Sequence, residues 1–173
     1  MLLRSSHAGE TLKGFDALSA AKKQEFVTIV SDPVRYARAL RPGSSNQETL
    51  TRPINDNLSA TLSQTATTYD VTSTYWKSAT ILGVAMTTAY IQYRYQTRAG
   101  LVVSSQSCSS WYTGNTTGLG ISTQPSHWLS GGKGYCYTVN TIQVVWRLGY
   151  SFAQEGWLYV NGVGIFSAGF RNL

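Results

Sequence analysis

Few side chains in the second part of the chain are of the types that carry acid–base catalysis. Residues 57–173 contain one histidine, one aspartate and one glutamate, which are His127, Asp70 and Glu155. Acid–base chemistry usually needs a positioned histidine or a pair of carboxylates, and a glycosidase needs two carboxyl groups flanking the scissile bond. Asp70 falls in a predicted strand and Glu155 in a predicted turn, so nothing in the spacing brings them together. We therefore expect a protein without enzymatic activity.

Nucleophilic catalysis has two further candidates around the same histidine. Ser126 or Ser130 could form a triad with His127 and Asp70, but the sequence has no GxSxG motif. Cys136 could form a dyad with His127, although a disulfide explains this cysteine better. The spacing favours neither arrangement.

The sequence contains no clear motif for a metal site or a phosphate site. Histidine, cysteine, aspartate and glutamate do not cluster, and a metal site needs such a cluster. The stretch SGGKGY at 130–135 resembles part of a phosphate-binding loop, but it has the wrong spacing and no following helix. We interpret it as a turn and expect no cofactor and no metal.

The chain has two cysteines, Cys108 and Cys136, with neither a CxxC motif nor a paired histidine. This spacing excludes the usual zinc sites. A single structural disulfide is the favoured interpretation, and two free buried thiols are the alternative.

Aromatic side chains are the remaining candidates for function. The segments SSWYTGN and QPSHWLSGGKGY both lie between the two cysteines, and we interpret them as loops that the disulfide holds together. Tyrosine and tryptophan stack on sugar rings and anchor protein interfaces. The alternative is that these rings pack beneath the loops. The predicted ligand- or partner-binding residues are Trp111, Tyr112, Asn115, His127, Trp128 and Tyr135.

The charge of the chain is low and spread out. Charged residues make up 13% of the sequence, against about 25% in a typical globular domain, and the net charge of +6 has no basic cluster. This pattern argues against a nucleic-acid partner and is compatible with anionic membranes or glycans. No hydrophobic run could span a bilayer. The polar, weakly charged surface is common in secreted proteins, although the N-terminus lacks the apolar core of a signal peptide.

Residues 15–41 carry the clearest helical pattern in the sequence. Ser19 can cap a first helix with Phe26, Val27 and Val30 as its apolar stripe. Asp32 is a good N-cap, and Pro33 suits the first helical position of a second helix. Val34, Ala37 and Leu40 then share one face. We assign residues 1–41 to a helical N-terminal segment and the polar residues 42–66 to a linker or strand-like arm.

Residues 67–173 alternate with a period of two, as β-strands do. In GVAMTTAYIQYRYQT, one face carries Ala85, Ala89, Ile91, Tyr93 and Tyr95. In YTVNTIQVVWRLGYSF, read as one long strand, one face carries Ile142, Val144, Trp146, Leu148 and Tyr150. Shorter strands are expected at 68–74, 75–82, 100–105 and 121–124.

The C-terminal segment predicts a hairpin. Asn161 and Gly162 suit the two positive-φ positions of a type I′ turn, and residues 157–160 should then pair with 163–166. Seven to eight antiparallel strands in one domain predict a β-sandwich or small barrel.

The arrangement resembles small secreted bacterial proteins of the actinobacterial kind. The resemblance rests on LSAAKKQEFVTIVSDPVRYARAL, on TYWKSATILGVAMTTAYIQYRYQT and on the two cysteines. Such proteins have a short helical region, a Ser/Thr-rich connector and a β-sandwich with one disulfide, and some are adaptors in secreted toxin particles. The resemblance implies a secreted protein and assigns no functional residue.

The sequence therefore favours a secreted, non-enzymatic binding or adaptor protein, whose residues 1–66 dock to a protein partner. One alternative is a lectin-like or membrane-binding toxin component. The other is a viral jelly-roll coat subunit, which the lack of a basic arm disfavours.

Overall fold

The computed structural model describes residues 9–40, 58–65, 68–116, 118–145 and 150–173. Three short helices come first, followed by eight strands. The helices are α1 (Gly9–Asp16), α2 (Ala20–Ser31) and α3 (Pro33–Ala39). The strands are β1 (Leu58–Thr65), β2 (Thr68–Ile81), β3 (Val84–Arg98), β4 (Leu101–Gly114), β5 (Leu119–Ser130), β6 (Lys133–Val144), β7 (Ser151–Asn161) and β8 (Gly164–Asn172).

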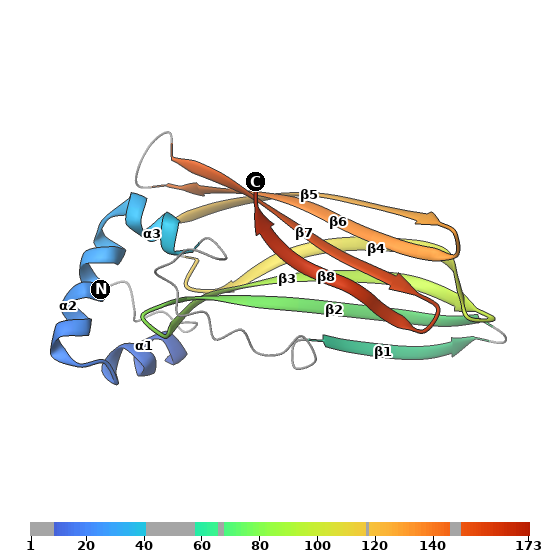
Figure 1. The fold of residues 1–173 in the computed structure, drawn as a ribbon, viewed down its shortest axis with the longest axis horizontal. Helices are drawn as coiled ribbons and strands as arrows, with labels where there is room; N and C mark the ends of the chain where they lie inside the picture. Colours follow the sequence, from blue (N-terminus) through green and yellow to red (C-terminus); the bar gives the residue numbers. More distant parts are fainter. Residues whose placement is uncertain (1–8, 41–57, 66–67, 117, 146–149) are drawn as a thin grey trace.

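The strands form two antiparallel four-stranded sheets with orders β1-β2-β3-β4 and β5-β6-β7-β8. Within each sheet, every strand pairs with the next one along the chain, so each sheet is a simple meander. The sheets form two layers, with the helices at one end and the tips of the β3–β4, β5–β6 and β7–β8 hairpins at the other (Figure 1). The predicted β-sandwich is confirmed.

The core has two parts along the length of the sandwich. One cluster lies between the sheets and contains Ile91, Tyr93, Leu158 and Val160. The other lies at the helical end, where Phe26 and Tyr36 pack with strand residues of both sheets. The helical segment therefore closes one end of its own β domain.

The predicted helix caps are confirmed. The Ser19 side chain accepts a hydrogen bond from the backbone N–H of Lys22, and Asp32 Oδ1 accepts one from Val34 at 2.9 Å. Pro33 opens α3. Helix α1 lies within the predicted helical segment 1–41 but begins before residues 15–41, where the individual helices were placed. Val27, placed on the apolar stripe, is half exposed instead.

The segment 42–66, predicted to be a linker or a strand-like arm, contains strand β1, which pairs with β2 along its whole length. Residues 42–57 and 66 lie outside the described residues. The predicted strands 68–74 and 75–82 are one strand, β2.

A β-bulge corrects the predicted face of β3. Ala79 pairs with Thr87 and Thr80 pairs with Ala85, so Met86 is an extra residue. The bulge reverses the alternation, which buries both Met86 and Thr87 and leaves Ala85 exposed. The other four residues of the predicted face are buried: Ala89, Ile91, Tyr93 and Tyr95.

The predicted long strand at 137–152 is also wrong. Strand β6 ends at Val144, and β7 begins at Ser151. Ile142 and Val144 are buried as predicted, whereas residues 146–149, including Trp146 and Leu148, lie outside the described residues.

The C-terminal hairpin exists, but its turn differs from the prediction. Asn161 pairs with Gly164, so the turn residues are Gly162 and Val163. Asn161 Oδ1 accepts hydrogen bonds from the backbone N–H groups of Val163 and Gly164, at 2.9 and 3.0 Å. A type I′ turn needs two residues with positive φ, and neither Asn161 nor Gly162 has a positive φ. The turn is therefore not type I′, and the Asn161 side-chain contact favours its different geometry.

Candidate ligand-binding face

The two cysteines join the layers of the sandwich. Cys108 on β4 and Cys136 on β6 form a disulfide, with their Cα atoms 5.4 Å apart. The predicted bond is confirmed, but the predicted loops around it are wrong. Residues 101–114, 119–130 and 133–144 are strands. Their Ser- and Thr-rich sequences suit strands whose outer face meets water, and they lack the apolar alternation that would have identified them.

The six predicted binding residues do not form one site. Trp128 and Tyr135 lie together on the outer face of β5–β8, as the register with the inward-facing Cys136 shows. Trp111 lies on the outer face of the opposite sheet. The other three are Tyr112, Asn115 and His127, and each occupies a separate place.

Trp128 and Tyr135 stack in parallel. They are cross-strand partners on β5 and β6, with ring centroids 5.2 Å apart and an interplanar angle of 5°. Tyr135 is in turn the register partner of Tyr159 on β7, which meets it edge-on at 5.1 Å. A row of three aromatic rings therefore crosses three strands, as cross-strand aromatic pairs favour. Trp128, on the edge strand, is 44% exposed.

A second β-bulge adds Phe166 to this row. Tyr159 pairs with Ser167 and Val160 with Ile165, so Phe166 is the extra residue on β8. Its ring lies edge-on to Tyr135 at 6.4 Å and tilted against Tyr159 at 6.2 Å. Phe166 is 46% exposed. The bulge therefore places a fourth ring on the outer face.

A second row of rings lies next to the first. Tyr137 and Trp157 are register partners, two residues along from Tyr135 and Tyr159. Trp157 Nε1 donates a hydrogen bond to Ser167 Oγ at 3.0 Å, and its ring covers Gly169, where any Cβ would collide with the indole. We call the six rings the aromatic face: Trp128, Tyr135, Tyr137, Trp157, Tyr159 and Phe166.

Polar groups border the aromatic face. The ammonium group of Lys133 lies 5.3 Å from the centre of the Phe166 ring. Arg171 forms an ion pair with the buried Glu155, and Tyr137 donates a hydrogen bond to the same carboxylate. The guanidinium of Arg171 lies 5.9 Å from the Trp157 ring centre. Glu155 therefore holds two outer-face side chains in place.

Four members of the aromatic face were missed from the sequence, because only residues between the cysteines were considered. Tyr135 with Tyr137 and Trp157 with Tyr159 are each two residues apart, so each pair shares one face of a strand. This spacing in YCY and WLY was the available signal. The position of Phe166 depends on the bulge and carries no such signal.

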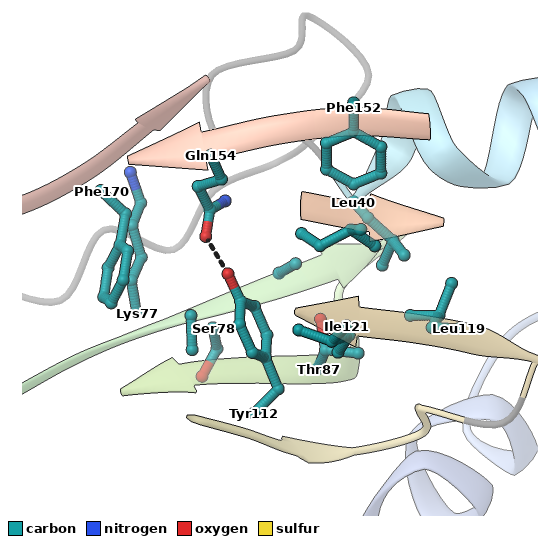
Figure 2. Close-up of a pocket in the computed structure, with 13 residues that line it drawn as sticks. Leu40, Lys77, Ser78, Thr87, Tyr112, Leu119, Ile121, Phe152, Gln154 and Phe170 are labelled. Carbon is teal, nitrogen blue, oxygen red and sulfur yellow. Dashed lines mark hydrogen bonds between the residues drawn. The ribbon is translucent and has the colours of Figure 1, made fainter. Parts of the chain in front are cut away.

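Tyr112 points into a narrow cleft between the sheets near the helices. Its hydroxyl donates a hydrogen bond to Gln154 Oε1 at 2.7 Å, as Figure 2 shows. Mostly apolar side chains line the cleft, together with Lys77, Ser78, Thr87 and Gln154. Its empty volume is about 480 Å³ when the open mouth is included. Burial raises the pKa of Tyr112 and lowers that of Lys77. Tyr112 is therefore a core residue.

Asn115 and His127 have structural contacts. Asn115 is buried, and its backbone carbonyl accepts a hydrogen bond from the Tyr36 hydroxyl. His127 Nδ1 lies 2.6 Å from Ser105 Oγ on β4, and the Tyr93 hydroxyl donates to the same oxygen at 2.7 Å. His127 thus helps to join β5 to β4 where the sheets meet.

The catalytic combinations considered from sequence do not assemble. Asp70 lies on the outer face of β1–β4, where the amide nitrogens of Gln96 and Gln106 donate to Oδ1. Glu155 lies on the outer face of the other sheet, so these two carboxylates cannot flank one bond. Cys136 is in the disulfide, and Ser126 Oγ donates to a backbone carbonyl. Within the described ranges, no His, Cys, Asp or Glu side chains group as metal ligands would.

Among the helices that the structure describes, none is long and apolar enough to cross a membrane. The resemblance to secreted actinobacterial proteins stays a prediction. No protein family matches the chain, and neither a curated protein nor a solved structure is significantly similar to it.

Proposed function

We propose that this protein binds carbohydrate through the aromatic face of β5–β8. The observation that carries the proposal is the row formed by Trp128, Tyr135, Tyr159 and Phe166 on a solvent-facing sheet surface. Apolar patches of this kind on a folded domain mark interaction sites. Two of the rings, Trp128 and Phe166, are nearly half exposed.

The arrangement suits a sugar because it combines flat apolar rings with hydrogen-bonding groups at their edges. A pyranose presents C–H groups on its faces and hydroxyl groups around its rim. Tyrosine and tryptophan offer an apolar ring together with a polar atom. Lys133 and Arg171 add donors beside the rings. Ring contacts across three strands hold Trp128 in place before a ligand arrives, which lowers the entropic cost of binding.

The proposal is tested by screening the protein on a glycan array and measuring affinity for the glycans that bind. Trp128→Ala should weaken binding at least about tenfold, equivalent to about 1.4 kcal/mol. Val103→Ala, which removes an exposed apolar side chain on the opposite sheet, is the matched control and should bind as the wild type does. An array with no bound glycan would refute the proposal.

The adaptor function expected from sequence stays a separate prediction. It relies on residues 1–66, and α2 and α3 already bury Phe26 and Tyr36 against their own sandwich. The glycan proposal therefore has the stronger geometric support. Deletion of residues 1–66 would also remove the helical cap, so a pull-down is better made with Val27→Asp, which changes an exposed helix position.

A further inference from the structure

We infer that the outer face of β1–β4 is a second glycan-binding site, centred on Trp111 and suited to an uncharged, extended polysaccharide, so that one molecule links two glycan strands. The inference rests on the proposed function, because it assumes that the aromatic face binds glycan. It adds a second site, the chemistry of its ligand and a cross-linking activity.

The second site is built around another row of stacked rings. Trp76, Tyr90 and Trp111 are register partners on β2, β3 and β4. Tyr90 and Trp111 stack with centroids 5.1 Å apart and planes within 2°, and Trp76 stacks on the other side of Tyr90 at 6.3 Å. Like the row containing Trp128, this row has an edge-strand tryptophan stacked on a tyrosine of the neighbouring strand.

In both rows the tryptophan lies on an edge strand and its ring is exposed. Trp111 on β4 is 38% exposed, and Trp128 on β5 is 44% exposed. Each indole stacks with one face on a tyrosine. Among the described rings, Tyr90 alone stacks on Trp111, and the 38% of Trp111 that is exposed is the part that a ligand could contact. The tyrosine behind it fixes the indole orientation.

Among the described residues, the two rows that flank Trp111 and its ring partners are polar and uncharged. On one side of the ring row, Ser78, Thr88 and Thr113 lie in register, and the Ser78 and Thr88 hydroxyls are 2.9 Å apart. On the other side, Thr74, Gln92 and Ser109 form the next row, and Gln92 Nε2 donates to Thr74 Oγ1 at 3.2 Å.

Hydroxyl and amide groups exchange hydrogen bonds with sugar hydroxyls, and neither row presents a charge to a partner. The positive charge of Arg94, which pairs with Ser107, lies outside these two rows, in the row beyond Gln92 and Ser109. A charged ligand would lose hydration over these rows without gaining an ion pair. The complementary ligand is therefore a neutral glycan, and the regular rows suit an extended chain better than a single sugar.

One glycan strand cannot occupy both sites. The inner faces of the sheets share one core, and Cys108–Cys136 joins the layers, so the two ring rows face opposite directions. Two independent sites on opposite faces make the molecule bivalent, and bivalent binding links ligand strands into a network.

The experiment uses the full chain with two defined neutral probes, the β-1,4-linked hexasaccharides of glucose and of mannose. Titration calorimetry gives the number of sites, and light scattering with hydroxyethyl cellulose or galactomannan gives cross-linking. We expect two sites for the wild type and one for Trp111→Ala or Trp128→Ala. Each single variant should lose the scattering increase, and the double variant should bind neither hexasaccharide.

Controls separate a lost contact from a lost fold. Trp111→Phe keeps a ring on Tyr90 and should retain the second site with roughly two- to tenfold weaker affinity, and near-ultraviolet circular dichroism checks folding. Val103→Ala, on the same strand, should keep both sites.

The outcomes distinguish this inference from the proposed function. If Trp128→Ala abolishes all binding and Trp111→Ala changes nothing, the second site is wrong and the proposed function stands. If Trp111→Ala abolishes all binding and Trp128→Ala changes nothing, the aromatic face is the wrong site and cross-linking is refuted. A wild type with a single site for both hexasaccharides also refutes the inference.

Discussion

The backbone of Gly162, at the tip of the β7–β8 hairpin, lies directly against Gly100, at the tip of the β3–β4 hairpin. A Cβ atom on Gly162 would collide with the carbonyl group of Gly100. The two sheets therefore touch through bare backbone at the end far from the helices, and glycine is required for this close approach.

Replacing Gly162 with alanine should separate the two hairpin tips. We expect Gly162→Ala to lower the free energy of unfolding by about 1–3 kcal/mol, as overpacking of a tight contact does. Urea denaturation measures the change. Gly9→Ala is the control, because a Cβ at Gly9 meets nothing within 4 Å. Equal stability of Gly162→Ala and the wild type would contradict this close contact.

A glycine in place of Ala99 should stabilise the turn between β3 and β4. Ala99 has φ of 48° and Gly100 has φ of 76°, which are the two positive values of a type I′ turn. An L-residue in this region costs roughly 1–2 kcal/mol, so Ala99→Gly should raise the free energy of unfolding by about 1 kcal/mol. Ala85→Gly, at an exposed strand position, should instead lower it by roughly 0.5–1 kcal/mol. Thermal unfolding of both variants gives the comparison, and a destabilised Ala99→Gly would count against the turn.

The disulfide should contribute strongly to stability and resist reduction in the folded state. The sequence separation is 28 residues, and closing a loop of this size stabilises a fold by about 3–4 kcal/mol. Cys136 is fully buried and Cys108 is 8% exposed. We expect Cys108→Ala/Cys136→Ala to lose about that much free energy of unfolding. Intact mass should show reduction by dithiothreitol in urea and none in native buffer, and rapid native reduction would show that the bond is accessible.

Alkaline pH should unfold the protein through its buried tyrosines. Burial raises the pKa of Tyr36 to about 12, above the ordinary value of about 10. Between these two values the unfolded chain has lost the proton and the folded chain keeps it, so stability falls as pH rises, by about 1.4 kcal/mol per pH unit for this residue. Tyr36→Phe should show a shallower decline in urea titrations between pH 10 and 12. An equally steep decline for Tyr36→Phe and the wild type would contradict this effect of burial.

The sequence predicted the sandwich well where strands alternate between apolar and polar residues. Strand β3 was found because Ile91, Tyr93 and Tyr95 recur with a period of two and are buried. The bulge at Met86 was not predictable, because an inserted residue changes the face without changing the composition. The Asn161–Gly162 turn failed for a local reason, since the Asn161 side chain captures two backbone N–H groups.

The candidate site was predicted less completely than the fold. Of the six residues predicted to lie together in loops, Trp128 and Tyr135 are neighbours, but as cross-strand partners and not as loop residues. In the structure Trp111 lies apart from these two residues, because β4 and β5 belong to different sheets. Which sheet a polar strand joins depends on pairing between distant segments, and the composition of SSQSCSSWYTGN does not encode it.

The position of the Cys108–Cys136 bond has a mechanical consequence. Two polymer strands held on opposite outer faces would pull the layers apart along the direction perpendicular to both sheets. The strand-pairing hydrogen bonds run within each sheet, so they oppose such a pull poorly, and packed side chains can peel away one row at a time. Tension would instead pass through the covalent bond between β4 and β6, and the layers would stay joined until one of those strands was itself drawn out.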